Sequence, residues 1–143
     1  MAITLERIDT EHGPSVRAQV RHGDHVFGAL VSGGRKTLQP LLGRKSLVEM
    51  SFEQIASWRT IPAFDDEDSC IRASPTIPGS VMLQGRVHNV LAIDSQSSVV
   101  DLYLQTGPEF IAINSKQLGG FVPEVGSALE LHVDGLCVYP TDT

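Results

Sequence analysis

The amino-acid sequence predicts a mainly β protein that folds as a small antiparallel barrel or sandwich. Between Val81 and Pro140, short apolar runs are separated by Gly, Pro, Asp and Ser, which is the pattern of strands joined by turns. A second stretch, Ser15–Ser32, alternates apolar and polar residues around a glycine turn. The 143 residues, 41% of them hydrophobic, suffice for one domain, or two very small ones, with a buried core.

Composition and charge argue against several classes of protein. The 17 acidic and 11 basic residues give a net charge of −6, so phosphate backbones would repel the chain and nucleic-acid binding is disfavoured. No apolar run approaches the roughly 18 residues of a membrane span. The first ten residues carry Glu6 and Asp9 and lack the apolar core of a secretory signal, so we expect a cytoplasmic protein. Cys70 and Cys137 are accordingly expected to remain unpaired.

The stretch Ser15–Ser32 predicts a β-hairpin whose turn is formed by Gly23 and Asp24. Glycine at the first turn position supplies the positive φ that a type II′ turn requires. Because side chains alternate between the two faces of a strand, this register brings six apolar residues to one face. The three cross-strand pairs are Val16 with Val31, Ala18 with Ala29, and Val20 with Phe27.

The same register places His22 opposite His25, a spacing that metal ions use. A closed metal site needs further ligands, and the other histidines, His12, His88 and His132, lie on separate segments. Exposed turn histidines are the simpler interpretation, although a metal role for the pair stays open. We predict no metal and no cofactor.

Four basic residues lie in the loop after the hairpin: Arg35, Lys36, Arg44 and Lys45. The sequence GGRK at the start of this loop does not match the phosphate-binding pattern GxxxxGK[ST]. Four cations spread over ten residues are typical of a solvated loop. We therefore predict no phosphate site here.

The segment Leu47–Trp58 predicts a strand followed by a short helix. Apolar and polar residues alternate through Met50. Ser51, with Gln54 three residues later, forms a capping box, which predicts a helical turn that begins at Ser51. Trp58, the only tryptophan, is expected to fill a core, with a partner-binding surface as the alternative.

Residues 61–80 predict an acidic, proline-rich connector between an N-terminal region, 1–60, and a barrel, 81–143, although the three ranges could pack as one domain. Its acidic run lacks the alternating ligands and turn glycine of a calcium loop. Four adjacent acids without a rigid scaffold are unsuited to catalysis but could dock a basic partner. The candidate partner-binding residues are Asp65, Asp66, Glu67, Asp68 and Trp58.

Residues 81–143 supply five strand candidates. Gly85 marks a position where a barrel strand bends or bulges. Leu129, Leu131 and Val133 alternate with polar residues, so His132 is expected on the solvent face.

Three motifs in this range point to a known family: Gly85-x-Val87-x-x-Val90, the segment Ala112–Lys116 (AINSK) that ends a hairpin, and Pro123-x-x-Gly126 before Leu129-x-Leu131-x-Val133. Together they resemble TOBE-type domains, small OB-like barrels found in molybdate-binding proteins and attached to transporter ATPases. The resemblance implies an OB-like barrel, preceded here by an N-terminal β-hairpin extension and one short helix. It also implies oxyanion contacts for Ser115 and Lys116. The SARN-like segment of the molybdate-binding members is absent.

The chain could also contain a duplicated unit. Aligning residue 15 with residue 98 matches several residues without a gap, among them Ser15 with Ser98, Phe27 with Phe110, Pro40 with Pro123 and Gly43 with Gly126. The apolar faces disagree in that alignment, and one inserted residue would correct them because a one-residue slip exchanges the two faces of a strand. Duplication therefore stays open.

No enzyme motif is present: the sequence lacks GxSxG, HExxH and the Rossmann glycine pattern. We predict a non-catalytic protein that binds another protein, of basic character, as an adaptor or as an acidic inhibitor or immunity-type module. The alternative is a TOBE-type barrel that binds or senses an oxyanion, and a homo-oligomer stays open. An anion site should gather Ser115 or Lys116 at a pocket, whereas a protein site should be an apolar patch rimmed by acids.

Overall fold

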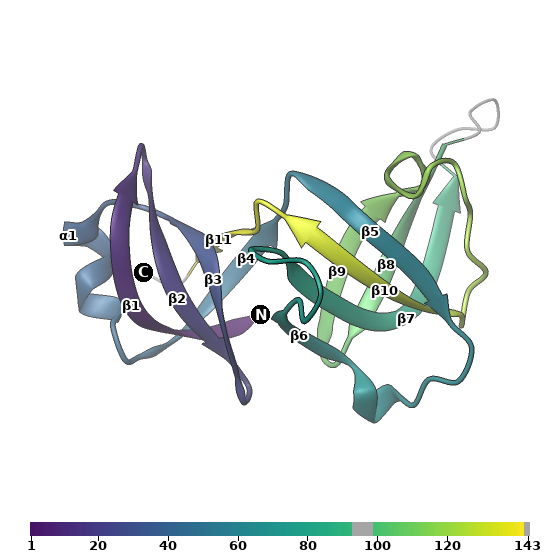
Figure 1. Ribbon diagram of the computed structural model, residues 1–143, viewed down its shortest axis with the longest axis horizontal. Coiled ribbons are helices and arrows are strands. Elements are labelled where there is room, and N and C mark those ends of the chain that lie inside the picture. The colour runs from purple at the N-terminus through teal and green to yellow at the C-terminus, as the bar shows by residue number, and fades with distance from the viewer. Residues whose placement is uncertain (93–98, 142–143) are drawn as a thin grey trace.

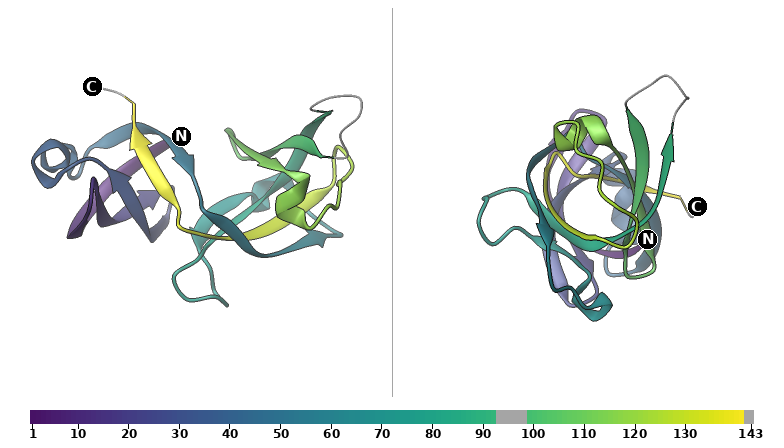
Figure 2. Two further views of the ribbon diagram at one scale, coloured as in Figure 1. Left: turned by 90° about the horizontal axis from the view of Figure 1, so that it is seen from above. Right: turned by 90° about the vertical axis from the view of Figure 1, so that its right-hand side faces the viewer.

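The computed structural model describes residues 1–92 and 99–141, and it consists of two β lobes side by side (Figures 1 and 2). The strands are β1 (Ala2–His12), β2 (Ser15–His22), β3 (His25–Ser32), β4 (Lys45–Ser51), β5 (Gln54–Ile61), β6 (Cys70–Ala73), β7 (Val81–Ala92), β8 (Val100–Thr106), β9 (Glu109–Asn114), β10 (Ala128–Asp134) and β11 (Cys137–Pro140). The helical segments are α1 (Arg35–Leu38) and the short 3-10 helices η1 (Gln39–Leu41), η2 (Asp66–Asp68) and η3 (Ser115–Leu118). The predicted mainly β fold with one short helix is confirmed.

The first lobe is a closed barrel in the order β1-β2-β3-β11-β4, with β4 pairing back to β1. Its fifth strand comes from the other end of the chain. β11 runs parallel to β3, with Cys137 beside Leu30, and antiparallel to β4, with Cys137 beside Ser51. The barrel of the first fifty residues therefore closes only with the last strand.

The second lobe is a sheet in the order β5-β10-β7-β8-β9, with β6 on the free side of β7. Here too one strand comes from elsewhere, because β5 follows β4 directly in the chain and pairs antiparallel with β10. Within the described residues no strand joins β9 to β5, so this sheet stays open. The sheets thus mix the predicted ranges 1–60 and 81–143, since each lobe takes one strand from the other half of the chain.

The two lobes share one five-stranded topology. Their strand orders match when β1–β5 are equated with β7–β11 and β6 is set aside. The pairing registers match as well. Gln54 corresponds to Cys137 and Ser51 corresponds to Asp134, each 83 positions apart. Gln54 pairs with Asp134, and Cys137 pairs with Ser51. This agreement favours the duplication that the sequence left open. The exchanged fifth strands hold the two copies together.

The turn that leads into the fourth strand repeats the same hydrogen bond in both lobes. The amide of Gly43 donates to the Leu5 carbonyl at 2.9 Å, and the amide of Gly126 donates to the Val87 carbonyl at 2.8 Å. The two glycines are 83 positions apart, whereas Leu5 and Val87 are 82 positions apart. The alignment of β1 with β7 is therefore shifted by one residue relative to the alignment of the turns.

The β2–β3 hairpin forms in the predicted register. Val16, Ala18 and Val20 pair with Val31, Ala29 and Phe27, and all of them except the partly buried Ala29 lie in the core. Gly23 has φ of +59°, as the predicted turn requires. In the second lobe the matching inward residues of β8 are Leu102 and Leu104, which face Ile113 and Ile111. They lie 84 positions after Ala18 and Val20, so one inserted residue does align the apolar faces.

Three local predictions are wrong. The helical turn expected at Ser51 is absent, because Gln54 begins strand β5 and pairs with Asp134. The single α-helix instead starts at Arg35, in the segment predicted as a loop. His132 is buried rather than solvated, because both faces of β10 are covered and Ser74 of the 74–80 loop contacts its ring. Among the described residues no helix is long and apolar enough to cross a membrane.

Candidate functional site

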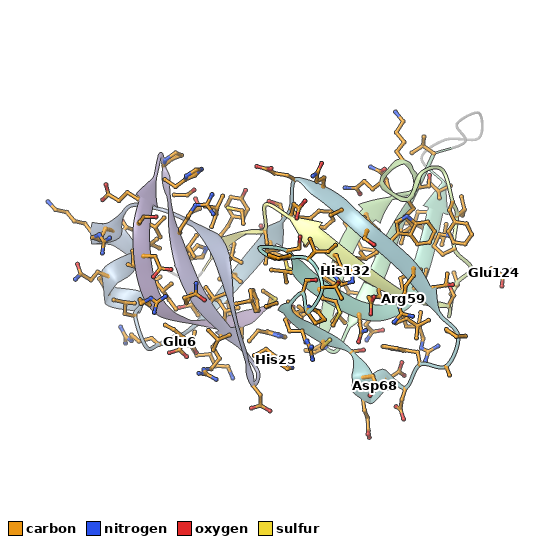
Figure 3. All side chains as sticks on the ribbon, viewed as in Figure 1. Glu6, His25, Arg59, Asp68, Glu124 and His132 are labelled. Atoms are coloured by element: carbon orange, nitrogen blue, oxygen red, sulfur yellow. The ribbon has the colours of Figure 1, made fainter. Side chains whose placement is uncertain are left out.

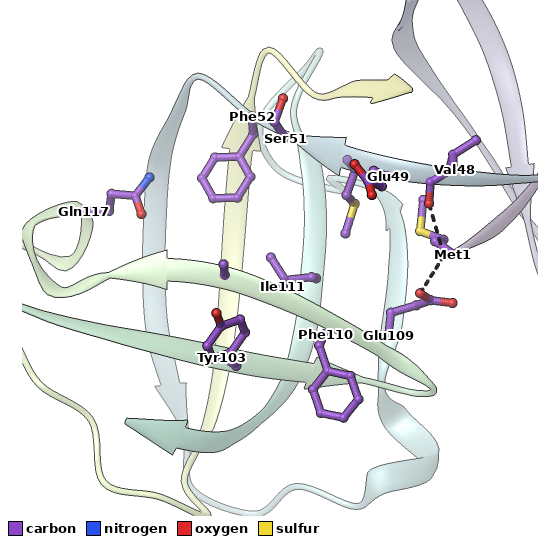
Figure 4. Close-up of a pocket in the computed structure, with 12 residues that line it drawn as sticks. Met1, Val48, Glu49, Ser51, Phe52, Tyr103, Glu109, Phe110, Ile111 and Gln117 are labelled. Atoms are coloured by element: carbon purple, nitrogen blue, oxygen red, sulfur yellow. Dashed lines mark hydrogen bonds and ion pairs between the residues drawn. The ribbon is translucent and has the colours of Figure 1, made fainter. Parts of the chain in front are cut away.

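A groove of about 510 Å³ lies between the two lobes, along the outer edges of β4 and β9 (Figure 4). Residues 48–52 line one side and residues 109–112 line the other. Ile111, Phe52 and Tyr103 supply apolar surface inside the groove, while Phe110 beside them is 54% exposed and rests edge-on against His88. The groove is thus open to solvent and combines apolar side chains with polar ones.

The ends of the groove differ in charge. The Met1 ammonium lies 3.0 Å from the Glu109 carboxylate and donates to the Val48 carbonyl at 3.2 Å. Glu49 is exposed near the same end, and no ion pair in the described part of the chain involves it. Gln117 lies at the opposite end (Figure 4). The rim of the groove is therefore acidic at one end and neutral at the other.

Both strand edges that face the groove have backbone groups without a strand partner. Gly107 and Pro108 form a two-residue hairpin loop, so Glu109 and Ile111 direct their N–H and C=O groups to β8. Phe110 and Ala112 must then direct theirs outward, where no strand of the described residues pairs with β9. On β4, pairing with β1 ends at Leu47, which leaves Met50 facing the groove unpaired.

The two residues predicted to contact an oxyanion have different roles. Ser115 is buried, and its Oγ accepts a hydrogen bond from the Val100 amide at 3.0 Å, so this hydroxyl ties η3 to the start of β8. Lys116 is exposed, and no ion pair in the described residues involves it. Neither residue lines the groove between the lobes. Of the two, only Lys116 is accessible to a ligand.

The first lobe carries its own exposed cations at the corresponding place. Arg35 and Lys36 lie in α1, which follows β3 as η3 follows β9. Both side chains are exposed and, like Lys116, belong to no ion pair within residues 1–92 and 99–141. Each repeat therefore presents uncompensated positive charge just after its third strand.

The acidic run lies on the surface of the second lobe, around η2. Asp65 caps η2 by accepting a hydrogen bond from the Glu67 amide at 3.1 Å. Asp66 forms an ion pair with Arg86 at 2.8 Å, and the same guanidinium donates to the carbonyls of Phe64 and Gly126. Two of the four acids thus hold the loop in place, which leaves Glu67 and Asp68 available for a partner.

Trp58 lies on β5 and stacks on Phe121, with the ring centroids 5.2 Å apart. It is half-buried and packs against the edge of the hydrophobic core. Phe121 remains 44% exposed, so the stack forms part of the outer surface. It is separate from the acidic run with which the sequence grouped it.

His22 and His25 face each other across the hairpin turn, as predicted. Burial lowers the pKa of His22 from its ordinary value. Among the described residues no group of three or more His, Cys, Asp or Glu side chains could hold a metal ion. Cys70 and Cys137 are both unpaired and half-buried.

A buried polar network in the second lobe escaped the sequence analysis. The Glu130 carboxylate accepts two hydrogen bonds from Arg59, at 2.9 and 3.1 Å, and one from Gln84 at 2.6 Å. His132 lies 3.1 Å from the same carboxylate through Nε2, and its Nδ1 lies 2.7 Å from the Ser74 hydroxyl. Arg59, foremost among these partners, lowers the pKa of Glu130 to about 2. Figure 3 shows Arg59 and His132 in this lobe.

Ser74, His132 and Glu130 are the residue types of a hydrolytic triad, and they contact one another in that order. The hydrogen bonds of Ser74, however, indicate a structural role. The Ser74 hydroxyl accepts hydrogen bonds from the amides of Thr76, at 3.3 Å, and Ile77, at 2.9 Å. These bonds occupy the oxygen lone pairs that a nucleophile would use. The network therefore fastens the 74–80 loop to β10.

Comparison with known proteins supplies one match. No family model matches the sequence, and no curated relative matches it. Among solved structures, the cytoplasmic molybdate-binding protein ModG, in a crystal form with molybdate bound, is similar with a TM-score of 0.53 and 13% sequence identity. The similarity covers 96% of this chain and 92% of that one. It confirms the predicted OB-like, TOBE-like β fold and extends it from the last 60 residues to both lobes.

Proposed function

We propose that this protein is a non-catalytic binding protein whose ligand is a small oxyanion. The observation that carries the proposal is the shared fold with molybdate-binding ModG, which spans both lobes rather than one. The oxyanion alternative raised by the sequence thereby gains more support than a protein adaptor. We also propose the cytoplasm as its compartment, where the similar protein is found.

The residues best suited to the anion are the exposed cations after the third strand of each repeat. Lys116 serves the second repeat, and Arg35 and Lys36 serve the first. In a chain of net charge −6, an anion is attracted only where positive charge is left uncompensated. A Lys or Arg side chain contributes a charge-assisted hydrogen bond to such a ligand.

The test is calorimetric titration of the purified chain with molybdate, sulfate and phosphate at low ionic strength. We expect saturable binding of at least one anion, weakened about tenfold in Lys116→Gln and in the double variant Arg35→Gln/Lys36→Gln. Arg17→Gln is the control, because Arg17 is an exposed cation on β2 away from both segments. Absence of binding at millimolar concentrations of all three anions would refute the proposal.

A protein partner remains a second candidate, supported by the groove between the lobes. Its apolar surface and acidic end match what the sequence analysis required of a protein-binding site. The groove is unsuited to an anion, because Glu49 and Glu109 would repel it.

A further inference from the structure

The groove between the lobes has the backbone geometry of a missing strand position. One wall presents the outward groups of Phe110 and Ala112, and the other presents those of Met50. The described chain provides no strand partner for any of them. Unpaired backbone groups at a strand edge are the template on which a further strand adds.

The first lobe shows how the equivalent edge is used. There β11 pairs with the end of β3, at Leu30 and Val31, and the Leu30 amide donates to the Leu136 carbonyl at 2.9 Å. Val26 and Gly28, which correspond to Phe110 and Ala112, have no strand partner on their outer side among the described residues either. Asn114 takes the place of Leu30 in the second lobe, and its amide donates instead to its own capping partner, the Gln117 side chain, at 2.9 Å. The capping box ends strand addition at this point, so the open edge is confined to residues 109–112.

We propose that this groove binds an extended segment of a basic partner protein, which adds as a strand along β9. Edge pairing supplies affinity through main-chain hydrogen bonds. Because side chains alternate along a strand, those on one face of the segment reach Phe52 and Ile111, and those on the other face reach Tyr103. The inference is independent of the proposed oxyanion site, since Lys116 and Arg35 lie outside the groove.

Charge selects a basic partner over a second copy of this chain. Glu49 and Glu109 lie at the same end of the groove (Figure 4). Among the described residues that line it, the one cation is the Met1 ammonium, which is already paired with Glu109. A second copy would bring the same exposed Phe110 edge, but it also carries a net charge of −6, which opposes association of two copies. A segment with Lys or Arg at this end would pair with Glu49.

The test uses an acetylated and amidated hexapeptide of alternating lysine and valine, titrated into the ¹⁵N-labelled chain and followed by NMR. We expect the amide signals of Phe110, Ala112 and Met50 to shift and to gain protection from exchange. Two control peptides separate pairing from simple charge attraction. The first replaces lysine by glutamate, and the second carries N-methyl groups on alternate backbone amides; both should fail to bind.

Protein variants locate the interaction. Glu49→Gln should weaken binding about threefold and reduce its salt dependence, as for one partly screened ion pair. Glu124→Gln removes an exposed acid at the far end of the second lobe (Figure 3) and should leave binding unchanged. Three results would overturn the proposal: no shift at millimolar peptide, equal binding of the N-methylated peptide, or shifts centred on Asp65–Asp68.

Discussion

The two lobes are built from the same five-stranded unit, yet one is a closed barrel and the other an open sheet. In the first, the exchanged strand β11 contacts both neighbours, β3 and β4. In the second, the exchanged strand β5 pairs with β10 but not with β9. Closure therefore depends on a single strand pairing, and without it β9 keeps an open edge beside the groove that we assign to a partner.

Corresponding positions in the two lobes also carry different chemistry. Ile3 pairs with Ser46 in the first lobe, and Gly85 pairs with Leu129 at the same place in the second. The larger side chain of the pair is thus Ile3 on the first strand of the first lobe, but Leu129 on the fourth strand of the second lobe. Beside this pair, exposed Leu47 in the first lobe corresponds to buried Glu130 in the second. The second lobe therefore joins its strands through a buried carboxylate at a position where the first lobe has an exposed leucine.

The largest effect is expected from Gly85→Ala. A Cβ atom at this position would lie 2.3 Å from the Gln105 carbonyl oxygen and 2.7 Å from the Thr106 hydroxyl, so β7 and β8 would have to separate. We expect the free energy of unfolding to fall by about 3 kcal/mol, measured by urea denaturation. Gly28→Ala in β3 is the matched control, because its Cβ would meet only the Gln19 side chain, at 3.5 Å. Equal losses in the two variants would contradict the close approach of β7 to β8.

A smaller, pH-dependent effect is expected from Glu130→Gln. The folded-state pKa of Glu130 is about 2, below its ordinary value of 4.5. The ionised carboxylate therefore stabilises the fold fully above pH 4.5, and this stabilisation is lost as the pH falls toward 2. We expect the variant to be less stable by about 2 kcal/mol at pH 7, a figure reduced for the exposed guanidinium of Arg59.

The difference between the native chain and Glu130→Gln should shrink as the pH falls from 4.5 toward 2, because the native carboxylate is then protonated as well. Urea unfolding across this pH range measures the difference. Leu47→Gln, at the corresponding position of the first lobe, should show no such dependence on pH, since no carboxylate is removed. A constant difference for Glu130→Gln would mean that its ion pair does not set the stability.

The smallest effect is expected from Phe121→Ala. Phe121 stacks on Trp58 at the surface of the second lobe, and such pairs contribute about 1 kcal/mol. The variant should expose Trp58 and shift its fluorescence to longer wavelength, a clear signal because Trp58 is the only tryptophan. Phe110→Ala, which removes an exposed ring away from Trp58, should leave the fluorescence unchanged.

Features determined by neighbouring residues could be predicted from the sequence. The register of Val16, Ala18 and Val20 against their partners follows from the alternation of apolar residues and from the turn at Gly23. The predicted register of the first hairpin is therefore confirmed. The barrel class follows from repeated short apolar runs separated by turn residues. Both depend on interactions within about twenty residues of chain.

Features determined by distant strands could not be predicted. Gln54 has the local pattern of a helix start, but pairing with Asp134 makes it a strand residue. The alternation of apolar and polar residues in its strand places His132 on the solvent face, yet β5, β7 and the 74–80 loop surround it. The groove likewise joins residues 48–52 with 109–112, which no local pattern relates. Strand exchange between the repeats underlies these differences, and alternation within one strand carries no information about it.

Amide hydrogen exchange, read residue by residue by NMR, tests the difference between the closed and open lobes most directly. Leu30 on β3 is bonded to Leu136, whereas Phe110 and Ala112 on β9 face the groove. We predict that the Leu30 amide exchanges about a hundredfold more slowly than those of Phe110 and Ala112. Equal protection at the three positions would show that β9 is already paired, and would contradict both the open lobe and its role as a strand-binding site.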